Sequence, residues 1–427
     1  MRRRVMVSVG VADLIALIAA IGLGSLLVYN TPWLWQVRLG PEDSVWPMVG
    51  FLLTGGVIGS VMTARPGVGV PRPSYGRATT IALIALASVA VGTLLFRTYW
   101  SRAFIPVVVG VWLGASFAHR FVRRRRPWTE SMVVVSAEKE TVDQLAVAPH
   151  ARVVDVLDPG YEGELEPLAS STTLVVDLRA VLSDRMAQFV SSSVLAGLNV
   201  RHLTPVYEEH TGRLPIVHLA EGWELTVPVV RSAPFTPLKR VFDTLIVIVL
   251  APIALLIAMG VMASIKLASP GSVLFKQPRV GLNGRIFTLY KFRTMGLDAE
   301  RDGPQFAVKH DDRVFPIGRW LRRFRVDEIP QMWNVLRGDL AIVGPRPEQV
   351  AFVHHFEAVI PFYANRHLVR PGITGWAQVN YGYADDRADT IEKLAYDLYY
   401  VKHMSPGVDL AILGRSLWTV ITGFGAR

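Results

Sequence analysis

The sequence contains no cysteine and is poor in charged residues. Without cysteine, disulfide bonds, thiolate metal sites and cysteine nucleophiles are excluded. Charged residues make up 19% of the 427 residues and hydrophobic ones 51%, whereas a soluble domain usually carries about 25% charged residues. The shortage of charge predicts membrane segments, and the length allows two or three domains.

Acidic residues are outnumbered by basic ones, and the net charge is +10. Such a balance is typical of proteins that bind nucleic acid, anionic lipid or phosphorylated substrates. The sequence has no visible recognition helix or base-stacking motif for nucleic acid. We therefore expect no nucleic-acid partner and favour membrane lipids and a phosphorylated substrate.

The first third of the chain holds four apolar runs, at residues 11–29, 46–63, 78–96 and 104–119. Each has about the length of a spanning helix, which needs about 20 residues. The arginines after Met1 resemble the start of a signal peptide, but no small-residue cleavage site leads into a soluble domain, and further apolar runs follow. The pattern predicts an α-helical transmembrane bundle of four spans over residues 1–127.

Arginines predict the orientation of this bundle, because positively charged loops stay in the cytoplasm. They gather before the first run, between the second and third, and after the fourth: Arg2, Arg3, Arg4, Arg65, Arg72, Arg77, Arg120 and Arg123 to Arg126. The two other loops carry only Arg38, Arg97 and Arg102. Both ends of the bundle should therefore face the cytoplasm. Aromatic residues near the span ends fit the membrane interfaces: Trp33, Trp35, Trp46, Tyr99 and Trp100.

One acid, Asp13, lies inside the first apolar run. An ionisable residue within the membrane is a functional hypothesis by default. Its place near the end of the run leaves a second interpretation, in which the side chain simply reaches the lipid headgroups.

Residues 128–232 read as a soluble α/β region. Short β-branched runs at 132–136, 153–157 and 174–178 alternate with a helical pattern at 180–198, and 200–207 is a further expected strand. This alternation predicts a parallel sheet in a Rossmann-like α/β cytoplasmic domain. The turn after the first strand lacks the Gly-x-Gly-x-x-Gly fingerprint of a nucleotide site. A structural or oligomerising module is therefore favoured over nucleotide binding, and the proline-containing segment 232–237 predicts a domain boundary.

A further apolar run extends from Val241 to Ala263. A fifth span is the simplest interpretation, but both flanks are positive and Pro252 lies in mid-run, where it removes a helix hydrogen bond and bends the axis. A fifth crossing would also move the rest of the chain out of the cytoplasm. Each arm of about 12 residues rises about 18 Å, enough for one leaflet of a core about 30 Å thick. We predict a re-entrant membrane helix at 238–266.

The chain after residue 264 is polar and basic, and its first segment reads as two short strands around a Gly-Leu-Asn-Gly turn. Lys291 and Arg293 alternate along an expected strand, so both should point to the same side. Other arginines follow: Arg319, Arg322, Arg323, Arg325, Arg346 and Arg370. Together these cations predict a basic pocket beside the membrane, which suits a diphosphate better than a duplex. The candidate substrate-binding residues are Lys291, Arg293, Arg322, Arg346 and Arg370.

Asp327 and Glu328 stand side by side shortly before Pro330. Because proline is favoured in the first turn of a helix, the two acids should lie at the N-terminus of a helix that ends near Leu336. They fit an ordinary acidic cap favoured by the helix dipole. Because a helix N-terminus also binds phosphoryl groups, a carboxylate there, within a basic pocket, is placed to attack phosphorus. Its neighbour, about 100° round the helix, would then hold a metal or assist proton transfer.

Four segments carry a family resemblance: "KRVFD", "LYKFRTM", "RVDEIPQMWNVLRGDLAIVGPRP" and "VRPGITGWAQVN". Through them residues 235–427 resemble the bacterial sugar transferases, the monotopic-type polyprenyl-phosphate phosphoglycosyl transferases. With the spans and the α/β region in front, the whole chain resembles the large members that start exopolysaccharide, capsule or O-antigen synthesis at the bacterial inner membrane.

The resemblance implies an α/β catalytic domain on the cytoplasmic face, anchored by the re-entrant helix with its kink at Pro252. It implies transfer of galactose- or glucose-1-phosphate from a UDP-hexose to undecaprenyl phosphate, with release of UMP. By resemblance, Asp327 is the nucleophile that forms an aspartyl-phosphosugar, Glu328 is its partner, and both hold Mg²⁺. Arg322 and Arg346 fall on positions linked to phosphate binding. The resemblance leaves a homodimer open.

Three alternatives stay open on the sequence alone. The chain could be a non-enzymatic membrane scaffold or chain-length regulator of polysaccharide export. It could be a polytopic phosphoglycosyl transferase without a covalent step, although that would need many more spans. It could also carry out the same reaction with an N-acetylated sugar, because no residue identifies the hexose.

Overall fold

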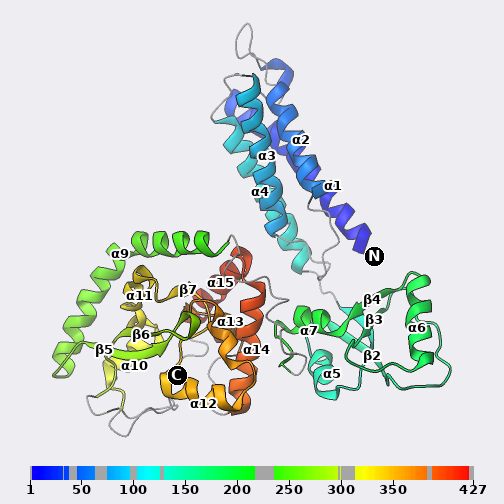
Figure 1. Cartoon of the computed structure of the whole chain (residues 1–427). Coiled ribbons are helices and arrows are strands. Elements are labelled where there is room, and N and C mark those ends of the chain that lie inside the picture. Colours follow the sequence, from blue (N-terminus) through cyan, green and yellow to red (C-terminus); the bar gives the residue numbers. More distant parts are fainter. Residues whose placement is uncertain are drawn as a thin grey trace. The chain divides into compact units, whose positions relative to one another are not determined.

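The computed structural model of the protein describes residues 2–31, 33–37, 46–62, 75–96, 103–125, 129–216, 235–296, 299, 313–381 and 387–422. The chain divides into two compact units, Met1–His210 and Thr211–Arg427 (Figure 1). Some residues named above lie outside the described part: Arg38, Arg65, Arg72, Arg97, Tyr99, Trp100, Arg102, Arg126 and the linker residues 232–234.

The four apolar runs of the first third form helices α1 (Arg2–Tyr29), α2 (Trp46–Met62), α3 (Tyr75–Phe96) and α4 (Phe104–Arg125), with a short 3₁₀ turn η1 (Leu34–Gln36). By length and composition α1, α3 and α4 can cross a membrane. The α2 helix has only 17 residues, which rise about 26 Å, slightly less than a hydrocarbon core of about 30 Å. The fourth helix of sufficient length in the described residues is α9 of the second unit.

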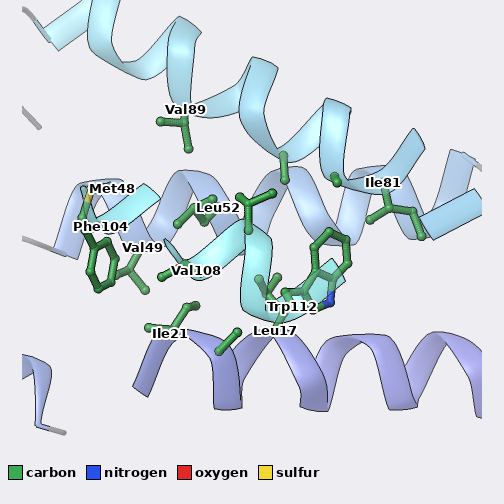
Figure 2. Close-up of a cluster of buried hydrophobic side chains, with 14 residues drawn as sticks. Leu17, Ile21, Met48, Val49, Leu52, Ile81, Val89, Phe104, Val108 and Trp112 are labelled. Carbon is green, nitrogen blue, oxygen red and sulfur yellow. The ribbon is translucent and has the colours of Figure 1, made fainter. Parts of the chain in front are cut away.

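The four helices share one apolar core (Figure 2). Leu17 of α1, Leu52 of α2, Ile81 of α3 and Trp112 of α4 are each almost fully buried in it. Glycine allows α2 and α3 to approach closely, since a Cβ on Gly55 would lie 2.7 Å from the Cα of Ala85. Small residues at such contacts are typical of helices that pack within a membrane.

Asp13 and Arg120 form a buried ion pair between α1 and α4. The Nη1 and Nη2 groups of Arg120 donate to the two carboxylate oxygens of Asp13, each at 2.6 Å. Ser116 donates to the same carboxylate and the Trp112 indole donates to the Asp13 carbonyl. Since Asp13 is 2% exposed and Arg120 0%, the second interpretation, in which Asp13 reaches the lipid headgroups, is wrong. Arg120, counted above among the flanking arginines, instead joins two helices.

We expect Asp13→Ala to destabilise the bundle by about 3–5 kcal/mol, because it leaves the Arg120 guanidinium buried and unpaired. The measurement is thermal or denaturant unfolding of the purified protein in detergent. An Asp13→Leu, Arg120→Leu double variant should be more stable than either single leucine variant, because no lone charge remains. If the single variants are as stable as the unmodified protein, the ion pair does not hold the bundle together.

The remainder of the first unit is a four-stranded parallel sheet in the order β2-β1-β3-β4. Its strands are β1 (Glu130–Val135), β2 (Ala151–Leu157), β3 (Thr173–Val176) and β4 (Asn199–His202), and its helices are α5 (Lys139–Ala146), α6 (Asp184–Leu195) and α7 (Leu203–Thr211). Successive residues of β1 and β3 point to opposite faces. One face packs on α5 and α7 and the other on α6. Both faces are therefore covered, as parallel sheets require.

The expected strands at 132–136, 153–157 and 174–178 and the expected helix at 180–198 are confirmed within a few residues. The expected strand at 200–207 is wrong in its second half, where the chain turns into α7. There Leu203, Val206, Tyr207 and His210 are buried, and this 3–4-residue spacing is that of one helix face.

The second unit begins before the expected boundary at 232–237. The backbone N–H of Leu214 donates to the carbonyl of Ala395 at 3.0 Å, and the Leu214 side chain is buried in the core of this unit. The described residues before 217 therefore already contribute to its packing.

The helix α9 (Phe235–Ala268) covers the predicted run 238–266 and extends it at both ends. Pro252 lies inside it, close to its midpoint. Figure 1 shows two arms that meet at an angle near the middle of the helix. A proline removes one hydrogen bond of the helix and its ring clashes with the preceding turn, so a bend there has an identifiable cause.

The rest of the second unit combines two short sheets with several helices. The predicted pair of strands around the Gly-Leu-Asn-Gly turn is confirmed as an antiparallel hairpin of β5 (Leu274–Val280) and β6 (Ile286–Phe292), joined by η3 (Leu282–Gly284). The strands β7 (Ala341–Val343) and β8 (Gly372–Thr374) pair in parallel. The other elements are α10 (Pro316–Arg323), η4 (Val326–Glu328), α11 (Gln331–Arg337), α12 (Val350–Val359), η5 (Tyr363–Leu368), α13 (Trp376–Asn380), α14 (Arg387–His403) and α15 (Pro406–Thr422).

Candidate active site

The two adjacent acids lie in the 3₁₀ turn η4, between α10 and α11. The chain reverses at Arg325, whose φ of 54° is left-handed, a conformation that costs a non-glycine residue about 1–2 kcal/mol. The prediction of one helix from Asp327 to Leu336 is therefore inaccurate, because α11 starts only at Gln331. Pro330 has no N–H to donate to Val326, so the α-helical hydrogen bonding cannot run through this point.

Both carboxylates are buried, each 7% exposed. One oxygen of Glu328 accepts from both Nη groups of Arg346 at 3.3 Å and lies 3.6 Å from the Lys291 ammonium. The Arg325 guanidinium lies 3.9 Å from the other oxygen. Burial would raise the pKa of Glu328, but Arg346, Lys291 and Arg325 together lower it to about 2. Glu328 is therefore a permanent anion under physiological conditions.

Asp327 behaves in the opposite way. Burial and the neighbouring Glu328 charge raise the pKa of its carboxyl, against the lowering effects of Lys291, Arg322 and Arg346. A carboxylate with a raised pKa holds its electrons less tightly and reacts more readily as a base or nucleophile. Two adjacent carboxyls with divergent pKa values are a common sign of distinct chemical roles.

Lys291 lies on β6 and faces Glu328. Burial and the positive charge of Arg346 lower the pKa of its ammonium to about 8, although Glu328 and Asp327 oppose this. Asn334 of α11 fixes this strand against the helix that follows the acids. Its amide donates to the Thr288 carbonyl at 2.7 Å and accepts from the Tyr290 N–H at 3.2 Å.

Asn334 was not among the residues predicted for the site, yet its side chain is completely buried. The backbone carbonyl of the same residue accepts from the N–H groups of Gly338, Asp339 and Leu340. In the sequence, Asn334 is a polar residue within the apolar run before Gly338 and Asp339. That position was the signal that could have indicated such an anchor.

The structure gathers most of the predicted cations around the acids. Arg322 donates to the Thr294 hydroxyl at 2.9 Å, and its charge acts on Asp327. Lys291 and Arg346 contact Glu328 directly. Arg325, which was counted among the cations but not among the substrate-binding candidates, joins this group.

Arg293 and Arg370 direct their donors to backbone carbonyls and not to the two acids. Arg293 donates to the carbonyls of Ser269 and Pro270 at 3.0 and 2.7 Å, just beyond the end of α9. Arg370 donates to the Gly338 carbonyl at 3.2 Å, at the far end of α11. There it lines a separate cavity with Lys239 and Arg240.

The two acids suit a divalent cation whose coordination is completed by water and a phosphorylated substrate. No group of three or more His, Asp or Glu side chains that could hold a metal occurs in the described residues. The second oxygen of Glu328 is buried without a hydrogen-bond partner, which leaves its lone pairs open. Mg²⁺ commonly takes one or two carboxylates and fills its remaining positions with water and substrate phosphates. Asp327 and Glu328 fit such a partly filled site.

Comparison with known proteins places these residues in a family. Residues 235–423 match the family described as bacterial sugar transferase. A UDP-glucose:undecaprenyl-phosphate glucose-1-phosphate transferase of Caulobacter vibrioides is 42% identical over 194 residues, which cover 43% of this chain and 70% of that protein. The chain belongs to the bacterial sugar transferase family.

Two larger relatives match as well. A UDP-N-acetylgalactosamine-undecaprenyl-phosphate N-acetylgalactosaminephosphotransferase of Aeromonas hydrophila is 43% identical over 258 residues, 60% of each chain. A UDP-glucose:undecaprenyl-phosphate glucose-1-phosphate transferase of Xanthomonas campestris is 40% identical over 213 residues, 48% of this chain and 42% of that protein. The match thus spans about half the length of these two relatives.

We expect the Lys291 amine to become reactive at lower pH than an ordinary lysine. Its neutral, nucleophilic form should be half-populated at about pH 8, against about pH 10.4 for an unperturbed side chain. Acetylation of the metal-free protein across a pH series, read by mass spectrometry of the peptide that contains Lys291, measures this directly.

The Glu328→Gln variant tests whether the neighbouring charges set the pKa of Lys291. The Glu328 carboxylate favours the charged ammonium and so raises the pKa of Lys291. Its removal should therefore shift labelling to still lower pH. A midpoint near pH 10 in the unmodified protein would contradict the burial and charge arrangement described here.

Proposed function

We propose that this chain transfers a hexose-1-phosphate from a UDP-hexose to undecaprenyl phosphate and releases UMP. The observation that carries the proposal is the η4 turn, where a carboxyl with raised pKa, Asp327, lies beside the permanently ionised Glu328. Lys291, Arg322 and Arg346 supply the surrounding positive charge. Support comes from membership of the sugar transferase family and from the reactions named in its relatives.

In the first step a carboxylate oxygen of Asp327 attacks the β-phosphorus of the UDP-hexose. The bond between that phosphorus and the bridging oxygen breaks, and UMP leaves with the electron pair. The product is an acyl phosphate that joins Asp327 to the sugar phosphate. Phosphoryl transfer depends mainly on positioning and on neutralising charge, and Lys291, Arg322 and Arg346 provide both.

In the second step a phosphate oxygen of undecaprenyl phosphate attacks the same phosphorus. The acyl-phosphate bond breaks and regenerates the Asp327 carboxylate, leaving a lipid diphosphate that carries the sugar. The covalent intermediate divides one difficult transfer into two easier ones. Throughout, Glu328 keeps Arg346 and Lys291 oriented by its charge. Asp327 and Glu328 would hold Mg²⁺, which when bound offsets the negative charge of the diphosphate.

The lipid acceptor requires a site at the membrane, and α9 meets this need as a re-entrant helix. Its 34 residues would measure about 51 Å as a straight helix, far more than a core of about 30 Å. Bent near Pro252, each arm of about 17 residues rises about 26 Å, less than the thickness of that core. Lys239 and Arg240 near one end and Lys266 near the other favour a common side for both ends. The catalytic unit then lies on the cytoplasmic face of a bacterial inner membrane.

The proposed sugar is a hexose, and the relatives are named for different sugars. The Aeromonas relative is named for N-acetylgalactosamine, and the Xanthomonas and Caulobacter relatives for glucose. A gluco- or galacto-configured UDP-hexose is the proposed donor, with an N-acetylated sugar as the second candidate. Release of UMP from a panel of UDP-sugars in nanodiscs decides between them.

If Asp327 is the nucleophile, the enzyme should release UMP once from a UDP-sugar before any lipid acceptor is added. The sugar phosphate should stay attached to residue 327, as seen by mass spectrometry. Asp327→Asn should abolish both the burst and the attached group, because a neutral amide is a poor nucleophile. Glu328→Gln should lose at least about a hundredfold in rate, as expected for a positioned catalytic group.

The controls for this experiment separate the mechanism from the activity. Chelation with EDTA should abolish the burst, and added Mg²⁺ should restore it. An enzyme that is active with lipid but shows neither burst nor attached sugar phosphate would remove Asp327 from the role of nucleophile.

The re-entrant arrangement predicts that both ends of α9 are reached from one side of the membrane. Single cysteines at Leu238 and Leu267, whose side chains are 49% and 90% exposed, can be introduced into a chain that has no cysteine of its own. In right-side-out and inverted vesicles, a membrane-impermeant maleimide should label both from the cytoplasmic side. Labelling from opposite sides would mean that α9 crosses the membrane.

A further inference from the structure

A second cluster of charges lies next to the candidate active site and takes no part in the chemistry above. It consists of Arg279, Glu348, Tyr363, Arg366, Lys393 and Asp397. Arg366 is 3% exposed and Asp397 1%, so this ion pair is more deeply buried than the catalytic carboxylates. It therefore needs an explanation beyond surface solvation.

The cluster holds the backbone that carries Arg346. Three successive carbonyls each accept a hydrogen bond: that of Arg346 from Arg366 at 3.0 Å, that of Pro347 from Arg279 at 3.0 Å, and that of Glu348 from the backbone N–H of Val280 at 3.1 Å. This short stretch is thus fixed at every peptide group, although it belongs to no helix or strand.

The side chains of this stretch connect two groups of charges. Arg346 extends to the Glu328 carboxylate. Two residues on, Glu348 bonds to Lys393 and approaches Arg366 to 3.9 Å. The same three residues therefore join the catalytic turn to the buried cluster.

Arg366 is itself held rigidly. Its Nη1 group donates to the Tyr363 hydroxyl at 2.7 Å, and its Nη2 group donates to the Asp397 carboxylate at 2.6 Å as well as to the Arg346 carbonyl. The planar guanidinium can make these bonds together because its donors form a fixed fork. A lysine ammonium at this position would be a single point and could not reach all three partners.

From this geometry we infer that Arg366 and Asp397 form a positioning pair, which fixes the main chain of Arg346 so that its guanidinium meets Glu328 and the substrate diphosphate together. The inference rests on the proposed function. Stability alone is a weak explanation, because apolar side chains of similar volume commonly stabilise a core as well as a buried ion pair does. Arg366 donates to the carbonyl of Arg346, and the Arg346 side chain bonds to Glu328. The pair therefore acts on a residue that contacts the catalytic turn.

A double-mutant cycle tests the positioning role. Arg366→Lys should lower kcat/KM for UMP release by about tenfold in the otherwise unmodified enzyme, mainly through a higher KM for the UDP-sugar, as Arg346→Ala itself should. In the Arg346→Ala background the same change should cost less than about twofold, because the group that it positions is gone. Coupling of this kind is expected only between residues that act through one another. Equal losses in both backgrounds would overturn the inference.

Leu398→Ala serves as the matched control, because Leu398 follows Asp397 in the chain and is completely buried in the apolar core of the same unit. It should lower Tm, and any change in kcat/KM should be the same in both backgrounds. If Arg366→Lys does not fold, Asp397→Asn replaces it in the cycle. That change keeps an oxygen acceptor for Arg366 and removes only the charge.

A binding measurement separates this inference from the proposed reaction. If the unmodified protein releases no UMP from any UDP-sugar, the proposed function fails, and the cycle is read through the rise in Tm caused by inorganic pyrophosphate. A rise that Arg366→Lys reduces only while Arg346 is present supports positioning. The absence of any rise in the unmodified protein, or an equal reduction in both backgrounds, overturns it.

Discussion

The buried anion of Glu328 is the interaction on which the catalytic turn depends. A carboxylate this far from water is stable only when cations compensate it, and Arg346, Lys291 and Arg325 do so from three different segments. The same anion raises the pKa of Asp327. One carboxylate thus organises the cations, and the other becomes reactive because its neighbour is already charged. Removal of either acid changes the charge around the other, so these five residues act as one electrostatic unit.

The remaining structure of the second unit joins this electrostatic unit to an apolar helix that is long enough to cross a membrane. The helix α9 is the most apolar of the described candidate spans, and its bend gives the hydrophobic segment two short arms in place of one long one. The Arg240 guanidinium, near the start of α9, donates to the carbonyls of Val335 and Leu336 at the end of α11. The helix that follows the two acids is therefore bonded directly to the apolar helix α9.

Much of this arrangement could be predicted from the sequence, because hydropathy and alternation are local properties. The four apolar helices, the parallel sheet, the β5–β6 hairpin and the gathering of Lys291, Arg322 and Arg346 around the acids follow from run length, period and motif. Contacts between distant side chains and backbone groups were not predictable in this way. Arg293 and Arg370 were expected in the basic pocket, but their donors bind carbonyls near the ends of α9 and α11. Asn334 was missed for the same reason, since its contacts to β6 are with the main-chain groups of Thr288 and Tyr290.

The ion pair in the helix bundle has a consequence for how the chain enters the membrane. Asp13 and Arg120 are 107 residues apart in sequence, and ribosomes add about 5–20 residues per second. Arg120 is therefore synthesised about 5–20 seconds after Asp13. An acid or arginine at the centre of a membrane helix costs about 2.5–3.5 kcal/mol during insertion, and Asp13 and Arg120, which lie near the ends of their spans, cost less than this before they pair. The ion pair that joins α1 to α4 can therefore form only after the fourth helix has been synthesised.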